Sequence, residues 1–502
     1  MSAAPEPSSQ PASTPLVRKS LRALLWSYGG AVARAGAQLV IQLMLARLLG
    51  PAAYGQAMAV FLVLALGWLM AEGGFGAALV QKEALETAHI RHALGWVLLI
   101  SSAMGLGVAA AAPLIARWLG DPALQPMLLA CGLLIPLQAL SNIPASLLKR
   151  ELNLRQTQFI QVGGYVLAYG GAGVGLAALG AGAWSLVAAF GLHSLVVLVG
   201  SQMALPQPLR VWRPSWRGHA DLRRFGLQVT GTNLLNWAIE NVDRLLISRY
   251  WGAAALGAYA AAANLSRAPA NLLVSSAQTV VFASASRLQQ DLPALRQGYL
   301  AAWRLCGLLA WPLFIGLAVH AQACVALLYG QRWAEAAPLF AAFCVALPLY
   351  ALLSISGPLL WAVNAVQAEM RAQAICLLLM GAGLLLCVGQ PLAQVVWWLP
   401  VLYALRLALV MVPLCQRLQL PWHQVMQAAL PGVAFAALAA VLGGLSQAWL
   451  GHSLSAALAF AVMLLISMGL LLAGAPGWWL GDGLAGRLPS RWRLTQRTPG
   501  AA

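Results

Sequence analysis

The sequence predicts an all-α integral membrane protein with about fourteen transmembrane helices. We expect two six-helix lobes, related by a pseudo-two-fold axis along the membrane normal, and two further C-terminal helices. Three observations carry this prediction: the composition, the length of the apolar runs and an internal repeat. The chain has 502 residues, of which 61% are hydrophobic and 9% charged, and its mean hydropathy is +0.76. A soluble domain carries about 25% charged residues, so lipid is the expected solvent.

The apolar runs are long and do not alternate with polar residues, as from Ala123 to Leu148. Barrel strands would alternate over about ten residues, whereas a membrane helix needs about twenty apolar residues. Helices are therefore expected. The predicted spans are 24–48, 55–80, 91–117, 123–147, 157–179, 182–204, 224–250, 254–284, 298–328, 335–361, 368–389, 392–415, 425–449 and 454–474.

The net charge of +17 is distributed in short basic clusters between the apolar runs. Examples are Arg18 with Lys19, and Lys149 with Arg150. Membrane proteins concentrate Lys and Arg in cytoplasmic loops, and with the N-terminus inside, these clusters fall in alternate loops. We therefore expect both termini in the cytoplasm, and we expect no nucleic-acid partner.

An internal repeat links the two halves of the chain. The segment ARLLGPAAYG begins at Ala46, and SRYWGAAALG begins at Ser248, so equivalent residues are 248 − 46 = 202 positions apart. Arg47, Gly50 and Gly55 thus match Arg249, Gly252 and Gly257 without a gap. Because both hairpins start on the inside, the repeats are parallel, which is typical of an axis along the membrane normal.

The repeat and the basic clusters together predict the domain boundaries. These are 1–20, a disordered cytoplasmic tail; 21–205, the N-lobe; 206–222, a cytoplasmic linker; 223–416, the C-lobe; 417–476, two extra helices; and 477–502, a basic cytoplasmic tail.

Polar side chains inside the predicted spans are the candidate site. A charge at the bilayer centre costs about 2.5–3.5 kcal/mol on insertion scales, so such residues point to function. We expect a substrate cavity between the lobes, lined by the first, second, seventh and eighth spans. Its candidate residues are Arg34, Gln38, Gln42, Glu72, Asn233, Asn236, Glu240, Asp243, Arg244, Asn264, Arg267 and Asn271. Arg406 is a further charge, in the twelfth span.

The residue types favour an anionic, hydroxyl-rich ligand, because Arg binds phosphate with a planar fork. Glu72, Glu240 and Asp243 are candidates for coupling transport to an ion, H⁺ or Na⁺. Glu240 and Arg244 are spaced i, i+4, so a purely structural pair is the alternative for them.

The sequence predicts no enzyme, no catalytic residue, no metal site and no cofactor other than the coupling ion. His89, His92 and His193 show no metal-ligand spacing. There is no GxxxxGK[ST] loop for a nucleotide. The seven cysteines fall in or beside apolar spans, and we interpret them as free, packed thiols.

Several motifs resemble bacterial polysaccharide flippases of the Wzx type. They are ARLLGPAAYG, the segment EGGFGAALVQ from Glu72, LLKRELNLR from Leu147, and ENVDRLLISRYWGAAALGAY from Glu240. The resemblance covers about residues 20 to 390 and is closest to the branch that exports exopolysaccharide and colanic-acid-like repeat units. These proteins belong to the multidrug, oligosaccharidyl-lipid and polysaccharide exporter superfamily.

The resemblance implies transfer of undecaprenyl-diphosphate-linked oligosaccharide across the bacterial inner membrane by alternating access, for synthesis of exopolysaccharide, O-antigen or capsule. It implies membrane lipids, a polysaccharide polymerase and export machinery as partners. Asn241 and Asp243 match the NxD pattern of the family's seventh span. Arg244 departs from it, since relatives often carry a neutral residue there.

Two other functions compete. An ion-coupled multidrug or metabolite antiporter on the same fold would present an acidic cavity to cations, whereas Arg and acids are mixed here. A membrane glycosyltransferase, polymerase or ligase would carry catalytic groups on a large outer loop. The outer loops here are short, with Asp121 or Glu335 as their acids.

Overall fold

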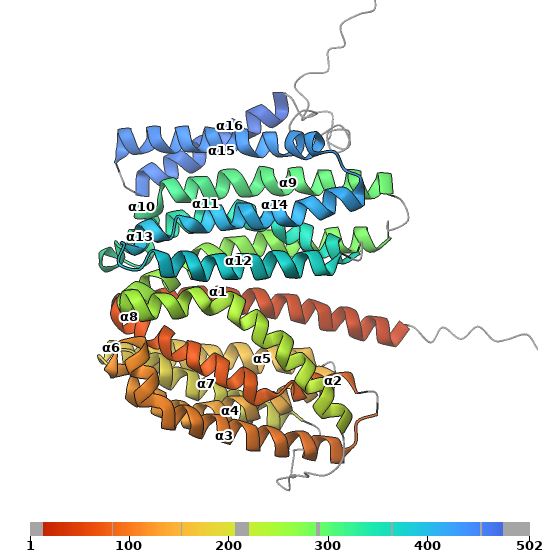
Figure 1. Ribbon diagram of the computed structural model, residues 1–502, viewed down its shortest axis with the longest axis vertical. Coiled ribbons are helices and arrows are strands. Elements are labelled where there is room, and N and C mark those ends of the chain that lie inside the picture. The colour runs from red at the N-terminus through yellow and green to blue at the C-terminus, as the bar shows by residue number, and fades with distance from the viewer. Residues whose placement is uncertain are drawn as a thin grey trace, which may run out of the picture. The chain divides into compact units, whose positions relative to one another are not determined.

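The computed structural model is built from helices (Figure 1), and the residues it describes contain no strand. It describes residues 14–82, 84–151, 153–205, 220–287, 292–362, 365–451 and 454–474. The predicted tail 477–502 and most of the predicted linker 206–222 lie outside these ranges. The predicted N-terminal tail, 1–20, overlaps the first helix, which begins at Thr14.

The chain divides into two compact units. The first comprises Met1–Leu49 and Gln56–Ala238, and the second comprises Gly50–Gly55 and Ile239–Ala502. The short segment at the turn of the first hairpin therefore belongs to the second unit, although the chain on both sides of it belongs to the first. The domain boundaries predicted from the sequence stay predictions.

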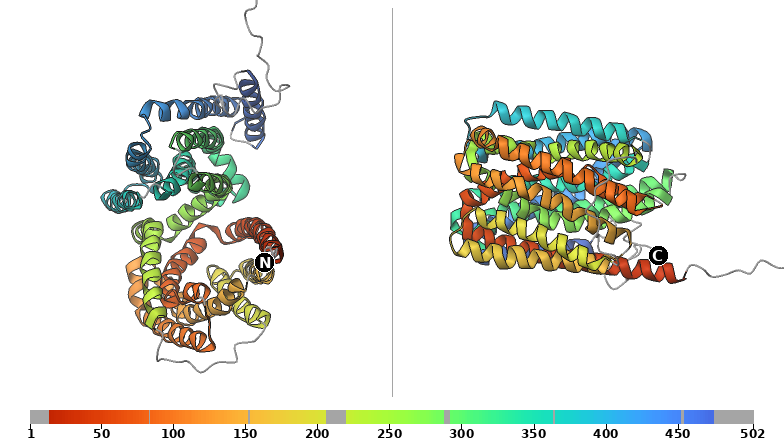
Figure 2. Two further views of the ribbon diagram at one scale, coloured as in Figure 1. Left: turned by 90° about the vertical axis from the view of Figure 1, so that its right-hand side faces the viewer. Right: turned by 90° about the horizontal axis from the view of Figure 1, so that it is seen from below.

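The first unit is a bundle in which α3 packs on α4, α4 on α7, and α5 on α7. Within each unit the long helices run side by side (Figures 1 and 2). The elements of the first unit are α1 (Thr14–Glu72), α2 (Phe75–Gln81), α3 (Thr87–Leu119), η1 (Pro122–Leu124), α4 (Gln125–Arg150), α5 (Leu154–Tyr165), η2 (Val166–Gly173), α6 (Val174–Ala178) and α7 (Trp184–Ala204).

The second unit packs α9 on α15, α11 on α14, α12 on α14, and α15 on α16. Ala439, Phe460 and Leu464 form the buried contact between α15 and α16. The helix α8 (Ala220–Arg287) belongs to the first unit up to Ala238 and to the second unit from Ile239. The other elements of the second unit are α9 (Leu292–Val319), α10 (Ala321–Leu328), η3 (Gln331–Trp333), α11 (Ala336–Ala362), α12 (Val366–Leu386), α13 (Leu392–Val395), α14 (Trp398–Leu418), α15 (Trp422–Leu450) and α16 (Leu454–Gly474).

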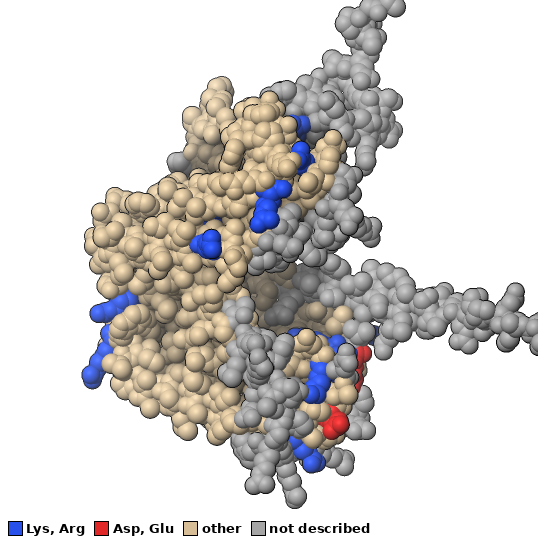
Figure 3. Space-filling model, turned by 45° about the vertical axis from the view of Figure 1, so that its right-hand side comes forward, with Lys and Arg blue, Asp and Glu red and all other residues tan. Residues whose placement is uncertain are grey.

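Within the described residues, ten helical segments are long and apolar enough to cross a membrane. Large apolar side chains point outward, as Leu133 (81% exposed) and Leu386 (85% exposed) do, and most of the described surface in Figure 3 carries no charged side chain. The predicted class, an all-α multi-pass membrane protein, is confirmed. The number of fourteen spans and the axis between the lobes stay predictions.

The hairpins of the predicted repeat have the same backbone. The long helix α1 is kinked at Gly50 (φ 72°, ψ 173°), and α8 is kinked at the equivalent Gly252 (φ 84°, ψ 177°). Within the second unit the two turns then meet closely. A Cβ atom on Gly55 would lie 1.7 Å from the Ala253 carbonyl oxygen, and one on Gly257 would lie 2.0 Å from the oxygen of Pro51. Only glycine fits at either position.

Three predicted spans are interrupted. The second, 55–80, breaks where α1 ends at Glu72 and α2 begins at Phe75, because Gly73 and Gly74 both have positive φ. The ninth, 298–328, is divided at His320 into α9 and α10. The fifth, 157–179, contains the π-helix η2.

Candidate functional site

The predicted site residues fall in both units, and each unit is described by itself. In the first unit Gln38 and Gln42 lie on α1, half-buried, and Asn233 and Asn236 lie on α8 and are exposed. Arg34 belongs to α1, but its side chain is outside the described part of the structure. The central cavity between the lobes stays a prediction.

Glu72 is held within the first unit by an amide. Its Oε1 accepts a hydrogen bond from Nδ2 of Asn142 on α4. The carboxylate lies where α1 stops, and Gly73 and Gly74 reverse the chain before α2 begins. Lys149, on the same helix as Asn142, acts on Glu72 electrostatically. This hydrogen bond therefore links the break between α1 and α2 to α4.

Arg150 binds the C-terminal end of α2. Its Nη1 donates to the carbonyl oxygens of Leu79 (2.9 Å) and Val80 (3.1 Å), and also to that of Lys82. These are carbonyl groups at the C-terminal end of α2, where a helix leaves acceptors unpaired and favours a cation. The basic cluster at Lys149 and Arg150, predicted only as a topology signal, thus also has a structural function.

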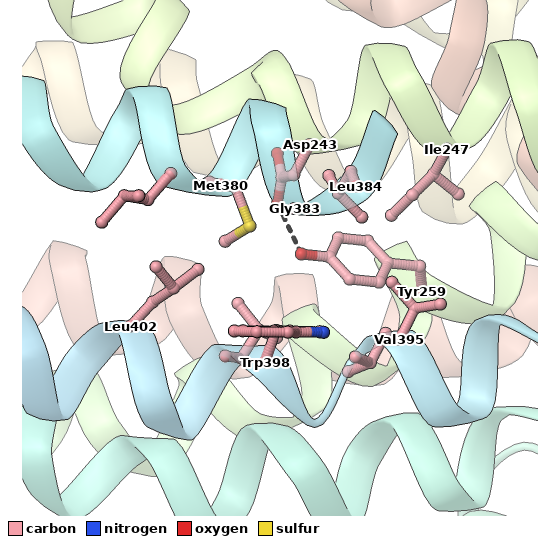
Figure 4. Close-up of a pocket in the computed structure, with 12 residues that line it drawn as sticks. Asp243, Ile247, Tyr259, Met380, Gly383, Leu384, Val395, Trp398 and Leu402 are labelled. Atoms are coloured by element: carbon pink, nitrogen blue, oxygen red, sulfur yellow. Dashed lines mark hydrogen bonds between the residues drawn. The ribbon is translucent and has the colours of Figure 1, made fainter. Parts of the chain in front are cut away.

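Asp243 and Tyr259 form the most distinct polar contact of the second unit. The Tyr259 hydroxyl donates to Oδ2 of Asp243 over 2.5 Å. Asp243 precedes the Gly252 kink of α8 and Tyr259 follows it, so this hydrogen bond joins the two arms of the hairpin. Both side chains line a cavity of about 20 Å³ with residues of α12, α13 and α14 (Figure 4).

Arg244 lies beside this pair. It acts electrostatically on the hydroxyls of Tyr259 and Tyr54. Glu240, one turn earlier on α8, is exposed. No salt bridge is found between Glu240 and Arg244, both of which lie in the described part of the chain.

The side chain of Asn264 contacts the turn of the first hairpin, residues 50–55. Its Nδ2 donates to the Tyr54 hydroxyl over 3.3 Å, and the Tyr54 ring meets Trp333 edge-on with centroids 5.6 Å apart. Tyr54 is 3% exposed. Residues 50–55 are therefore anchored in the second unit by an aromatic side chain as well as by the two close glycine contacts.

A cationic group of residues lies further along the same unit. Arg267 on α8 and Arg406 on α14 both act electrostatically on the Tyr403 hydroxyl. The Tyr403 ring packs edge-on against Tyr350 of α11, with centroids 5.9 Å apart. The buried Nε of Arg406 has no hydrogen-bond acceptor among the described residues. Arg267 and Asn271 are exposed on α8.

The sequence prediction missed the tyrosines of the site. Tyr54 and Tyr259 form hydrogen bonds with the predicted residues Asn264 and Asp243. Arg267 and Arg406 act electrostatically on Tyr403, and Tyr350 packs on the Tyr403 ring. Tyrosine is common at membrane interfaces, so its presence in a span carried no signal by itself. For Tyr259, the separation of 16 residues from Asp243 becomes meaningful only once the kink at Gly252 is known, because the kink brings the two arms of the hairpin together.

Comparison with known proteins identifies the family. A profile of the polysaccharide biosynthesis protein family matches residues 44–338, which is more than half of the chain. The chain belongs to the polysaccharide biosynthesis protein family. This confirms the resemblance of the hairpin motifs at the level of the family.

Three curated relatives are similar to this chain over about two thirds of their own length. The succinoglycan biosynthesis transport protein ExoT of Rhizobium meliloti (strain 1021) is 30% identical over 62% of this chain and 63% of its own length. The lipopolysaccharide biosynthesis protein WzxC of Escherichia coli (strain K12) is 24% identical over 66% and 67%. The teichuronic acid biosynthesis protein TuaB of Bacillus subtilis (strain 168) is 22% identical over 65% and 67%. The chain spans less than two thirds of ExoT.

Two solved structures share the fold. The lipid II flippase MurJ, in an inward closed conformation, superposes with a TM-score of 0.68 at 12% identity, over 90% of this chain and 99% of MurJ. An outward-facing multidrug resistance MATE family transporter of the MOP superfamily gives 0.51 at 14% identity, over 79% and 95%. The family member described here thus has the fold that these transporters share.

Proposed function

We propose that this protein is a flippase that moves undecaprenyl-diphosphate-linked oligosaccharide repeat units across the bacterial inner membrane by alternating access. Membership of the polysaccharide biosynthesis family and the MurJ-like fold support transport rather than catalysis. The Lys and Arg distribution supports cytoplasmic termini. A polysaccharide polymerase and export machinery are the partners that such a product requires.

The observation that carries this proposal is the cationic group of the second unit. Arg267 is exposed on α8, within the predicted eighth span, and Arg406 holds a buried Nε without an acceptor among the described residues. A guanidinium inside a span is costly unless it serves a ligand or a partner. A diphosphate or an acidic sugar supplies the anionic oxygens that these groups bind in bidentate geometry.

The alternative is an ion-coupled multidrug or metabolite antiporter, which the fold also accommodates. The charged residues of α8 and α14 distinguish the flippase from the antiporter. Within the predicted spans of these helices, the three arginines Arg244, Arg267 and Arg406 outnumber the two acids Glu240 and Asp243, and this balance favours an anionic substrate over a cationic drug.

The test is transport in proteoliposomes. A fluorescent undecaprenyl-diphosphate-linked oligosaccharide is followed with a membrane-impermeant quencher. We expect the native protein to move it, and Arg267→Ala to slow the initial rate about tenfold or more, as when a charge-assisted hydrogen bond worth about 1.5–3 kcal/mol is lost. Arg332→Ala is the matched control, because Arg332 is exposed in η3, between two predicted spans.

Equal rates for Arg267→Ala and Arg332→Ala would contradict the assigned site. Transport of a cationic dye in place of the lipid-linked oligosaccharide would favour the antiporter. Export by cells carrying Arg34→Ala tests the first unit in the same way, with surface polysaccharide as the measured quantity.

A further inference from the structure

Arg304 places a guanidinium group in α9, in a part of the second unit that the proposed substrate site does not use. It lies 304 − 292 = 12 residues after the helix begins at Leu292, which is about 18 Å along the helix. The residue is half-buried, and its Nε is buried without a hydrogen-bond acceptor among the described residues. A buried N–H group without an acceptor has lost its hydration for nothing, so a ligand that supplies an acceptor is expected here.

Arg296, which lies 304 − 296 = 8 residues earlier on α9, shows the contrast with a structural arginine. Its Nε donates to the carbonyl oxygen of Leu418, and its Nη2 donates to Oε1 of Gln419 over 3.1 Å. Both acceptors lie at the C-terminal end of α14, where a helix leaves carbonyl groups unpaired. Arg296 thus stabilises a helix end, whereas the Nε of Arg304 meets no acceptor in the described part of the chain.

The face of α9 that carries Arg304 is turned toward α15 and α16. Gly307 and Leu308 follow Arg304 at i+3 and i+4, so the three residues share one face of the helix. A Cβ atom on Gly432 of α15 would lie 2.9 Å from the Gly307 carbonyl oxygen. Leu308 packs in one apolar cluster with Met468 of α16, and Figure 1 shows the three helices next to one another. Arg304 therefore lies one turn beyond this three-helix contact, toward the start of α9.

The opposite face of α9 contacts α11 and α14. The Tyr299 hydroxyl shares a 2.8 Å hydrogen bond with Oγ of Ser356 on α11 and lies 3.2 Å from Sδ of Met411 on α14. Arg304 is five residues from Tyr299, which is about 140° around the helix. It therefore faces away from α14, the helix that carries Arg406 of the cationic group.

The helices around Arg304 supply no acid. Within the bounds given above, neither α9 nor the helices that pack on it, α10, α11, α15 and α16, contain an Asp or a Glu. A guanidinium inside a span is costly unless a partner neutralises it. The anion that Arg304 requires therefore comes from outside these helices.

The surface beside Arg304 is suited to membrane lipid. Leu430 and Val433 of α15 and Leu465 of α16 are exposed, and acyl chains cover such side chains in a bilayer. Arg304 is 304 − 298 = 6 residues inside the predicted ninth span, about 9 Å along the helix. A long arginine side chain reaches the headgroup level from this depth, and its planar fork binds phosphate.

We propose that Arg304 binds the phosphate of an anionic phospholipid at the contact of α9, α15 and α16, on the side of the membrane where α9 begins. The acyl chains of this lipid lie along α15 and α16, and its phosphate neutralises the guanidinium. An anionic headgroup such as that of phosphatidylglycerol is preferred to a zwitterionic one, because an ammonium group near the guanidinium repels it. The bound lipid thereby joins the two C-terminal helices to α9, and it is distinct from the transported substrate.

Thermal unfolding of the purified full-length protein in detergent tests the site. The probes are phosphatidylglycerol, phosphatidylcholine and undecaprenyl diphosphate, each added at the same concentrations. We expect phosphatidylglycerol to raise the unfolding temperature of the native protein the most, because a ligand that binds the folded state alone stabilises it. Native mass spectrometry measures the phosphatidylglycerol that stays bound.

Arg304→Met keeps the length of the side chain and removes its charge. Because Nε has no acceptor to lose among the described residues, we expect this variant to unfold without added lipid at no lower temperature than the native protein. Its affinity for phosphatidylglycerol should fall about tenfold or more, as when a charge-assisted hydrogen bond is lost. Arg304→Gln, which keeps a polar end without the charge, should lose affinity to the same extent. Arg371→Ala is the matched control, because Arg371 is an exposed arginine of α12.

A purely structural arginine gives a different pattern. If both variants of Arg304 unfold at a lower temperature without lipid and keep the native affinity for phosphatidylglycerol, the proposed lipid site is wrong. Equal stabilisation by phosphatidylcholine would contradict the preference for an anionic headgroup. Stabilisation by undecaprenyl diphosphate alone would assign Arg304 to the transported substrate instead. Loss of phosphatidylglycerol binding in both variants, with native binding in Arg371→Ala, is the result that the proposal predicts.

Discussion

The two repeated hairpins have one backbone design and different chemistry. Both are kinked at a glycine with matching dihedral angles, Gly50 and Gly252, and both place a second glycine where no Cβ fits. In the second hairpin, Asp243, Tyr259, Asn264 and Arg267 stand where the first has apolar residues. Their counterparts at an offset of 202 are Ile41, Ala57, Leu62 and Ala65. The repeat thus preserves the shape of the backbone, while the polar residues at these four positions occur in one copy only.

The acids of the two units differ in the same way. Glu72 accepts a hydrogen bond from Asn142 and holds a helix break, whereas Asp243 faces a cavity. The position equivalent to Glu72 in the second repeat is 72 + 202 = 274, which is the buried Val274. The presence of an acid inside a span therefore does not show by itself that the acid acts in transport. The residues around it decide whether its role is structural or functional.

The largest effect is expected at the shared backbone. Gly55→Ala places a Cβ 1.7 Å from the Ala253 carbonyl oxygen, so the turn must leave its position, at a cost of about 3 kcal/mol or more. Thermal unfolding of the purified protein in detergent measures it. Gly36→Ala is the control, because a Cβ there meets nothing within 4 Å. If both variants unfold at the same temperature, the close contact of the hairpins does not exist.

Arg150→Ala should come next in size, within the first unit. It removes the donor to three carbonyl groups at the end of α2, and hydrogen bonds from charged groups contribute about 1.5–3 kcal/mol each when measured singly. We expect a loss of stability of about 3 kcal/mol, again by thermal unfolding. Arg117→Ala, an exposed arginine at the end of α3, serves as the comparison. A loss of stability no larger than that of Arg117→Ala would show that Arg150 does not stabilise the end of α2.

Glu72 provides a smaller, diagnostic effect. Glu72→Ala leaves the Asn142 amide without its acceptor and should cost about 1–3 kcal/mol. Glu72→Gln retains an oxygen that accepts the same bond, so its unfolding temperature should stay close to that of the native protein. If Glu72→Gln destabilises as much as Glu72→Ala, the negative charge and not the hydrogen bond holds the break.

The smallest effect is expected at Tyr54→Phe. The variant loses the 3.3 Å contact with Asn264 but keeps the ring that packs on Trp333. A neutral hydrogen bond contributes about 0.5–1.5 kcal/mol, and this one is long. Loss of folded protein on removing the hydroxyl alone would show that the hydroxyl, and not the ring, anchors the turn.

Much of the fold could be predicted from the sequence, because hydropathy, basic clusters and the repeat of a ten-residue segment can be read directly from it. The amino-acid sequence alone shows that Gly50 and Gly252 occupy equivalent positions of the repeat. The break at Gly73 and Gly74 also had a signal, two adjacent glycines after Glu72, but the apolar run continued through it and masked the interruption.

The site could be predicted only in part. Asp243, Arg267 and Asn264 were found because polar residues in spans are costly. Their partners Tyr259, Tyr403 and Tyr54 were not, because tyrosine is amphipathic and ordinary in a membrane helix. Contacts such as Glu72 with Asn142 join residues 70 positions apart, and no spacing rule along one helix reveals them.

One measurement compares the two acids directly. In the same proteoliposomes, the initial rate of lipid-linked oligosaccharide transport is measured for Glu72→Gln and for Asp243→Asn. The account predicts that Glu72→Gln keeps the rate of the native protein and that Asp243→Asn loses it. Retention of the rate by Asp243→Asn, or its loss in Glu72→Gln alone, would contradict the claim that the second hairpin carries the transport chemistry.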